Sequence, residues 1–148
     1  MENIKLENLN YKFQLHYETR YTKIYSESEN KVILIQVVNH FIPIDEFKKI
    51  FNRSTEIIKS EKLNKVVFDK RKMSVFHQPS MEWYFTEWKA EIAENYQVVK
   101  HRKILPEDNL FIQSVKIARK KLDETYPDAK YKQLDIQYME SLEEAIKN

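Results

Sequence analysis

The spacing of hydrophobic residues predicts a block of strands at the start of the chain. Residues 11–17 and 20–26 alternate loosely between apolar and polar side chains, and residues 31–38 form a nearly continuous apolar run. Alternation is typical of a strand with one buried face, whereas a continuous run is typical of a strand buried on both faces. Asn30 lies in the turn before the last run and favours a hairpin there.

From Pro43 onward, stretches with helical spacing are separated by single short strands. The predicted strands cover residues 66–68, 98–105 and 130–138. Four helices are marked by apolar stripes or by a capping box: Ile44, Phe47, Ile50, Phe51, Ile57 and Ile58; Met81, Tyr84, Phe85, Trp88 and Ile92; Phe111, Val115, Ala118 and Leu122; and Ser141 to Glu144. The predicted order is therefore β-β-β-α-β-α-β-α-β-α.

This order indicates a single α/β domain over residues 1–148. Helices between single strands imply right-handed crossovers and a mixed, mostly parallel sheet with an antiparallel N-terminal hairpin and flanking helices. The chain contains no glycine and no cysteine. Phosphate-binding glycine loops, dinucleotide fingerprints, the nucleophile elbow, thiol chemistry and cysteine metal sites are thereby excluded.

Charge and hydropathy give no reason to expect nucleic-acid or membrane binding. The 25 basic and 23 acidic residues leave a formal net charge of +2, and no recognition motif is present. The longest apolar run is much shorter than the roughly 20 residues of a membrane span, and the polar first ten residues do not resemble a signal peptide. We therefore expect a cytoplasmic protein with no membrane span.

The segment after the strand at residues 66–68 is the predicted site, because α/β domains bind ligands at the carboxyl ends of their strands. Basic residues follow the strand, and a turn then leads into a helix rich in aromatic residues. The candidate ligand- or partner-binding residues are Asp69, Lys70, Arg71, Phe76, His77, Ser80 and Trp83.

Several segments, together with the element order, resemble the SpoIIAA-like group of the STAS superfamily. They are residues 69–72, the pairs Glu82-Trp83 and Glu87-Trp88, residues 104–108 and residues 141–145. The resemblance extends over about residues 20–146. It implies a non-enzymatic binding or regulatory module without a cofactor, and an architecture similar to that of CRAL-TRIO lipid-transfer domains.

The resemblance also makes Ser80 a candidate phosphoacceptor, because the related antagonists carry a phosphorylated serine between a strand and the next helix. Residues 75–80 lack the Asp and Gly of that turn. The alternative interpretation of Ser80 is a simple N-cap.

Two basic runs, residues 70–72 and 100–103, allow two interpretations. They could hold an anionic ligand or an acidic peptide if they faced one crevice. Alternation along the strand places Lys100 and Arg102 on one side and His101 and Lys103 on the other. A charged edge strand that blocks aggregation is the interpretation we favour.

The aromatic helix also allows two interpretations. Tyr84, Phe85 and Trp88 could line a pocket for an apolar or lipid-like ligand, but their helical spacing favours core packing. Trp83 lies off that stripe and could belong to a protein interface.

The four histidines show no metal-ligand spacing, so no metal site is predicted. Asp69 and His77 form the least implausible acid/base pair, but no matching nucleophile is evident. We therefore expect a non-enzymatic module that binds a protein partner, a second copy of itself, or a small apolar or anionic ligand. A carrier of an apolar or lipid-like ligand is the alternative.

Overall fold

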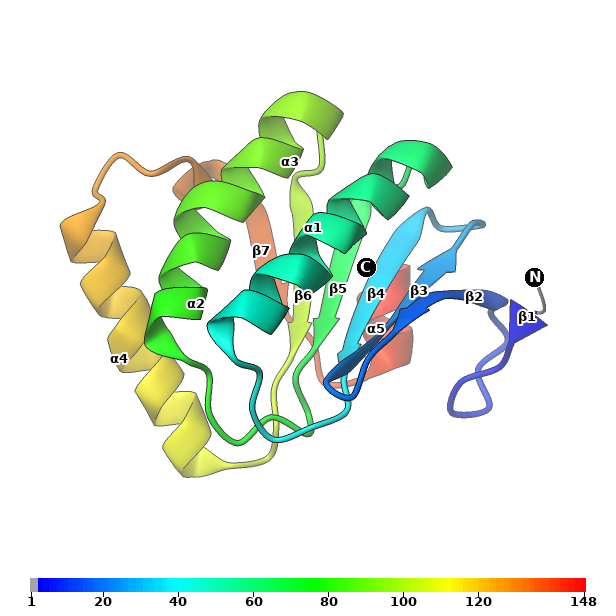
Figure 1. Cartoon of the computed structure of the whole chain (residues 1–148), viewed down its shortest axis with the longest axis horizontal. Helices are drawn as coiled ribbons and strands as arrows, with labels where there is room; N and C mark the ends of the chain where they lie inside the picture. Colours follow the sequence, from blue (N-terminus) through cyan, green and yellow to red (C-terminus); the bar gives the residue numbers. More distant parts are fainter. Residues whose placement is uncertain (1–2) are drawn as a thin grey trace.

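The computed structural model describes residues 3–148 and shows one seven-stranded sheet with helices on both faces (Figure 1). The strands lie in the sheet in sequence order: β1 (Asn3–Ile4), β2 (Phe13–Glu18), β3 (Thr22–Glu27), β4 (Val32–Val37), β5 (Lys65–Asp69), β6 (Lys100–Ile104) and β7 (Asp135–Tyr138). β1 to β4 pair antiparallel, and β4 to β7 pair parallel. The predicted mixed α/β sheet with an antiparallel N-terminal hairpin is confirmed.

The helices also follow the predicted order. They are α1 (Ile44–Glu61), α2 (Gln78–Trp83), the π-helical turn η1 (Tyr84–Trp88), α3 (Lys89–Tyr96), α4 (Asn109–Thr125), the 3-10 turn η2 (Lys130–Gln133) and α5 (Leu142–Lys147). α2, η1 and α3 follow one another without interruption. α5 lies behind the sheet, on the face opposite α1 and α3 (Figure 1).

The last strand is shorter than predicted. Residues 130–133 form η2 instead of strand, and β7 begins only at Asp135, opposite Lys100 of β6. The reason is the fully buried Tyr131, which packs edge to face against Phe85 at 5.2 Å between ring centroids. An extended backbone would alternate its side chains, whereas the 3-10 turn directs this ring into the core.

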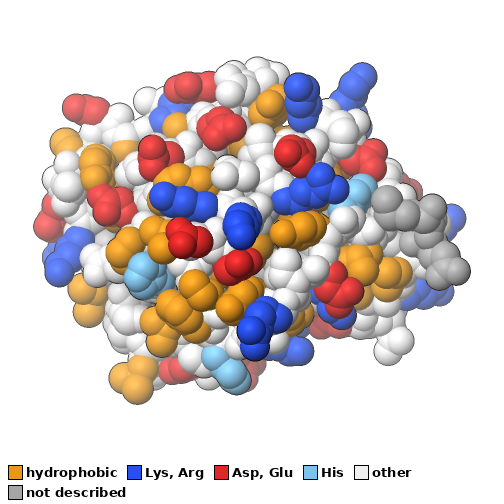
Figure 2. Space-filling view, in the orientation of Figure 1, with side chains coloured by type: hydrophobic (Ala, Val, Ile, Leu, Met, Phe, Trp, Pro, Cys, Tyr) orange, Lys and Arg blue, Asp and Glu red, His pale blue; other side chains and the backbone are white. Residues whose placement is uncertain are grey.

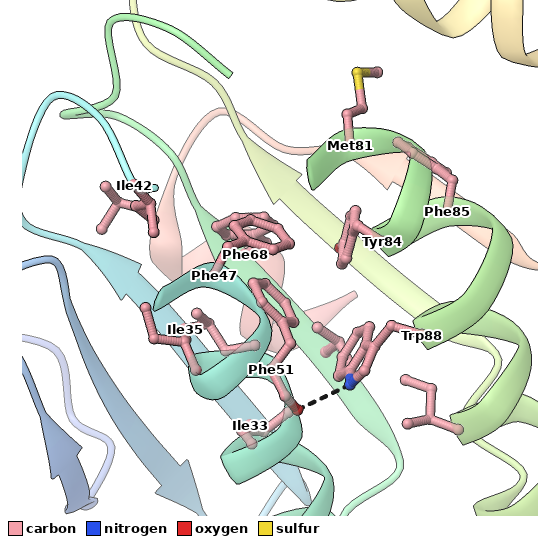
Figure 3. Close-up of a cluster of buried hydrophobic side chains, with 14 of the residues drawn as sticks. Ile33, Ile35, Ile42, Phe47, Phe51, Phe68, Met81, Tyr84, Phe85 and Trp88 are labelled. Atoms are coloured by element: carbon pink, nitrogen blue, oxygen red, sulfur yellow. Dashed lines mark hydrogen bonds between the residues drawn. The ribbon is translucent and has the colours of Figure 1, made fainter. Parts of the chain in front are cut away.

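The main core lies between the sheet and the α1 and α2–α3 layer. Val66 and Phe68 of β5 are fully buried, and so are Tyr84 and Trp88 of the aromatic helix. Figure 3 shows the rings of α1, β5 and η1 packed against one another, and Trp88 Nε1 donates a hydrogen bond to the Phe51 carbonyl at 2.9 Å. The aromatic stripe is therefore core packing, as its helical spacing indicated.

Turns without glycine place other residues in the left-handed region. Lys31 (φ 55°) lies in the hairpin between β3 and β4, and Lys62 (φ 54°) ends α1 with its N–H donating to the Ile58 carbonyl. The Glu27 carboxylate accepts from the Asn30 N–H at 2.8 Å, which supports the hairpin. Such residues cost roughly 1 kcal/mol each relative to glycine.

Candidate functional site

Asp69 and Arg71 of the predicted site form a hydrogen-bonded salt bridge with each other. The Asp69 carboxylate accepts from Arg71 Nη2 at 2.7 Å and from Arg71 Nε at 2.9 Å. The same guanidinium donates two parallel bonds, both 2.8 Å, to Glu7. Hydrogen bonds to Glu7 and then Asp69 raise the pKa of Arg71 above its ordinary value. The salt bridges of Arg71 therefore link the segment between β1 and β2 to the end of β5.

Ser80 is not the N-cap of its helix, so that interpretation is wrong. The helix begins at Gln78 with His77 in the N-cap position, because Pro79 fits the first turn, where its missing N–H costs nothing. Ser80 is fully buried, and its Oγ lies 3.2 Å from His77 Nδ1. Phosphorylation of Ser80 stays a prediction, and it would require the first turn of α2 to open.

Asp69 and His77 are not brought together as an acid/base pair. Asp69 is bonded to Arg71 and Gln36, whereas His77 contacts Ser80 and, edge to face, the Phe41 ring at 5.9 Å. Trp83 is partly buried and packs edge to face on Phe47 at 6.1 Å. Trp83 therefore belongs mainly to the contact between α1 and α2.

A cluster of buried cations lies on the face covered by the α2–α3 helices and α4. Lys70 follows β5, Lys89 opens α3 and Lys103 lies in β6, and their side chains are at most 1% exposed. Lysine is almost never fully buried unless it is paired. We call these three lysines with Arg119 of α4 the cation cluster. Only Lys70 of the four belongs to the predicted site.

The expectation that residues 100–103 form a charged edge strand is wrong. β6 is paired on both sides, with β5 and with β7, and His101, Arg102 and Lys103 are buried. The alternation of side chains holds, since Lys103 faces Phe85 and Arg102 points to the opposite face, near α5. A charge at this position therefore has no aggregation-blocking role.

The Phe85 ring is the centre of the cation cluster. Its centroid lies 4.4 Å from Lys103 Nζ, 4.6 Å from Arg119 Cζ and 5.1 Å from Lys89 Nζ. Lys70 Nζ lies between two other rings, 5.3 Å from Phe68 and 5.2 Å from Phe76. A desolvated cation–π contact is worth about 2 kcal/mol, which is less than the several kcal/mol needed to bury an ammonium ion.

Acidic side chains do not compensate for the free-energy cost of burying these lysines. Within residues 3–148, neither Lys70 Nζ nor Lys103 Nζ has a hydrogen-bond acceptor or an ion-pair partner, and Lys89 Nζ contacts only the imidazole Nδ1 of His101, at 3.0 Å. The acidic residue that acts on Lys103 is Asp123, which already accepts from Tyr131 Oη at 2.6 Å and Arg119 Nε at 3.3 Å. The cluster thus holds more positive than negative charge.

Two buried cations on the opposite face provide a contrast. Lys65 Nζ donates to the Ile146 carbonyl at 2.7 Å, at the end of α5. Arg102 donates to the Asp135 carboxylate at 2.9 Å and to the Asn148 carbonyl at 2.8 Å. Both cations therefore have acceptors, although Nε of Arg102 is buried without one in residues 3–148. Lys70 Nζ and Lys103 Nζ differ from them in facing aromatic rings instead of oxygen acceptors.

Burial shifts the protonation of the cluster. It lowers the pKa of Lys70 to about 7, with a further contribution from the charge of Arg119. Burial, followed by the charge of Lys70, holds the pKa values of Lys89 and Lys103 well below the ordinary lysine value. Burial and then Lys89 do the same to the pKa of His101. Without a counterion, the fold therefore favours neutral amines here.

The π-helical turn positions one of these amines. The N–H of Lys89 bonds to the carbonyl of Tyr84, five residues earlier, and Lys89 Nζ lies 4.6 Å from the Tyr84 ring centroid. Tyr84 Oη and His101 Nε2 are buried near it without a hydrogen-bond partner in residues 3–148. Single π turns are frequent at functional sites, and buried polar atoms without a hydrogen-bond partner are rare.

A pocket of about 440 Å³ lies between α2 and α4, next to the cation cluster. Its apolar lining comprises Val75, Phe76, Met81, Leu110, Phe111, Val115 and Ala118. The face seen in Figure 2 shows acidic and basic side chains interspersed, with no area of a single sign. The basic side chains on that face therefore do not form a positive surface patch.

Sequence reasoning missed Lys89 and Arg119 as site residues, and it considered Lys103 only in the less favoured interpretation that residues 100–103 face an anion-binding crevice. Two lysines at positions that the hydrophobic pattern assigns to the interior could have indicated the site. Lys103 lies inside a predicted strand, and Lys89 follows Phe85 by four residues on the helix that carries the aromatic stripe. A charged residue at a position that the pattern assigns to the interior marks either an error in the pattern or a site.

Comparison with protein-family models, with curated proteins and with solved structures finds no match to this chain. None of the helices within residues 3–148 combines the length and the apolar character needed to cross a membrane. In the same residues, no three His, Asp or Glu side chains are grouped as metal ligands would be.

Proposed function

We propose that this chain is a non-catalytic binding module of STAS type whose ligand is a small anion held by the cation cluster. The observation that carries the proposal is the burial of Lys70 and Lys103 without any acceptor in residues 3–148. Binding of a protein partner or of a second copy through residues 70–77 stays a prediction.

An anion would supply what the cluster lacks. Lys103, Arg119 and Lys89 all lie within 5.1 Å of the centroid of the Phe85 ring, so an anion beside this ring would be close to several basic groups. A bound carboxylate or phosphate would accept hydrogen bonds from the ammonium groups and favour their charged form.

Thermal unfolding in the presence of anions tests the proposal. Phosphate, sulfate, citrate and octanoate would be titrated at pH 7 and constant ionic strength, with sodium chloride as the reference salt. We expect at least one of them to raise the Tm with a saturable dependence on concentration, reaching about 2.7 kcal/mol of added stability at one hundred times its Kd.

A matched pair of variants ties the effect to the cluster. Lys103→Met removes a buried amine, whereas Lys100→Met removes an exposed amine from the same strand. Anion stabilisation should fall at least tenfold in apparent affinity in the first variant and remain unchanged in the second. Absence of a saturable response to all four anions, or equal responses of the two variants, would contradict anion binding at this site.

A further inference from the structure

We infer that the ligand is amphipathic, with its acidic head at the cation cluster and an apolar chain in the pocket between α2 and α4. This inference rests on the proposed function and names the class of its ligand. The occupant to which we commit is a free single-chain carboxylate of medium length, about eight to ten carbons, a size that suits a small ligand pocket.

The pocket and the cluster share structural elements. The Phe76 ring lines the pocket and lies 5.2 Å from Lys70 Nζ, so one ring separates the two. Helix α4 supplies Arg119 to the cluster and its neighbour Ala118 to the pocket. Phe76 is only partly buried. The inference requires this side chain to move aside when the ligand binds, because Phe76 separates the pocket from Lys70 Nζ.

The two regions differ in chemistry in the way an amphipathic molecule requires. The pocket is lined by apolar side chains such as Met81, Phe111 and Val115, and also by polar residues, namely Ser74, Gln78, Asp108 and Ser114. The cluster beyond Phe76 carries cations without acceptors. A chain laid in the pocket therefore directs its acidic end toward positive charge, and a volume of about 440 Å³ is at the small end of ligand pockets.

Calorimetric titration of the whole protein with butanoate, hexanoate, octanoate and decanoate at pH 7 tests the inference. Each methylene group buried in the pocket should lower Kd about fourfold, so octanoate should bind roughly fifteen times more tightly than hexanoate. Octan-1-ol has the same chain without the charge and should bind at least tenfold more weakly than octanoate.

The outcomes separate this inference from the proposed function. If all four carboxylates, or phosphate and octanoate, bind with equal affinity, the apolar chain is not recognised and only the inference fails. If neither the carboxylates nor phosphate, sulfate and citrate bind, both fail. Binding to vesicles of anionic phospholipid without binding of free decanoate would assign the site to a membrane surface and overturn the inference.

Two variants of α4 locate the chain. Ala118→Phe should fill the pocket and weaken octanoate binding at least tenfold while leaving phosphate binding unchanged. Ile117→Phe makes the same kind of change at an exposed neighbour and should leave both affinities unchanged. Far-ultraviolet circular dichroism verifies that both variants fold. If Ala118→Phe does not fold, the chain-length series on the unaltered protein tests whether the apolar chain of the ligand is recognised. Equal effects of the two variants would mean that this apolar chain does not bind in the pocket between α2 and α4.

Discussion

Nζ of Lys89 lies 3.0 Å from Nδ1 of His101, and both side chains are buried. A neutral amine can donate to Nδ1 or accept from an Nδ1–H, so the contact is compatible with either tautomer of the neutral ring. Nε2 of the ring has no hydrogen-bond partner in residues 3–148. Two basic groups thus share one hydrogen bond, and burial opposes the charged form of each.

We predict that the ligand-free protein becomes more stable as the pH rises from 7 to 9.5. The folded-state pKa of Lys70 is about 7, against 10.5 for an ordinary lysine, and those of Lys89 and Lys103 are also lowered. Between these values the unfolded chain binds more protons, so the free energy of unfolding increases with pH, by up to about 1.4 kcal/mol per unit for each neutral lysine. Urea unfolding at several pH values measures the slope.

Lys103→Met should reduce this slope and also raise stability at pH 7 by about 1–3 kcal/mol, because an apolar side chain of similar size replaces a buried amine. Lys100→Met should change neither quantity by more than about 0.5 kcal/mol. His101 also makes the free energy of unfolding increase with pH, but at lower pH. Below about pH 6.5 the imidazole is protonated in the unfolded chain and stays neutral in the folded protein, because burial lowers its pKa. Stability that falls between pH 7 and 9.5 would contradict the neutral state of the amines.

The fold was readable from the sequence because its determinants are local. Phe68 lies in a short apolar run, and Tyr84 and Trp88 recur at helical spacing. These patterns indicate the type of each element before any partner is known. Burial of both aromatic residues and of the strand at residues 66–68 follows directly from them.

The cation cluster depends instead on pairings that no local pattern encodes. Lys103 is buried because β7 pairs beyond β6, so that β6 is not an edge strand, and because the Phe85 ring covers its side chain. The predicted strand at residues 130–138 did not reveal which neighbour it would pair with. Arg119 comes from a helix, and its approach to Phe85 depends on how α4 lies against α3 and η1. Arg71 was predicted as a binding residue because it follows the strand at residues 66–68. Its salt bridge to the distant Glu7 is equally non-local and was not predicted.

Trp88 should be the more critical of the two tryptophans for stability. Its Nε1 donates to the Phe51 carbonyl and to Thr55 Oγ1, both at 2.9 Å, and it is fully buried between α1 and β6. Trp88→Phe removes these bonds and leaves a cavity, which should cost about 2–3 kcal/mol. Trp83→Phe, at a partly buried position, should cost about 1 kcal/mol or less. Urea denaturation measures the free energy of unfolding of both variants. Equal decreases would contradict the greater importance of Trp88.

Arg71→Lys should loosen the first strand pair more than the rest of the fold. A lysine keeps the charge but loses the parallel bonds to Glu7 and the second bond to Asp69. Because Arg71 is partly exposed, the global loss should be only about 0.5–1 kcal/mol. Hydrogen exchange should accelerate in residues 3–12 and not in α1. Arg53→Lys, at an exposed ion pair with Glu56, is the control and should change neither segment.

Anion binding should be accompanied by proton uptake, because the cluster is largely neutral in the free protein. A carboxylate within about 4–6 Å raises the pKa of an amine, so Lys70, with a pKa of about 7, becomes protonated on binding at pH 8. Calorimetry of octanoate binding in two buffers with different ionisation enthalpies should report at least about one proton taken up. The affinity should then fall about tenfold per pH unit above 8.

Lys70→Met should abolish most of the uptake, whereas Lys72→Met, which alters an exposed lysine in the same loop, should preserve it. Identical binding enthalpies in the two buffers would mean that the amines are already charged, and the buried cluster would then need a counterion other than the ligand.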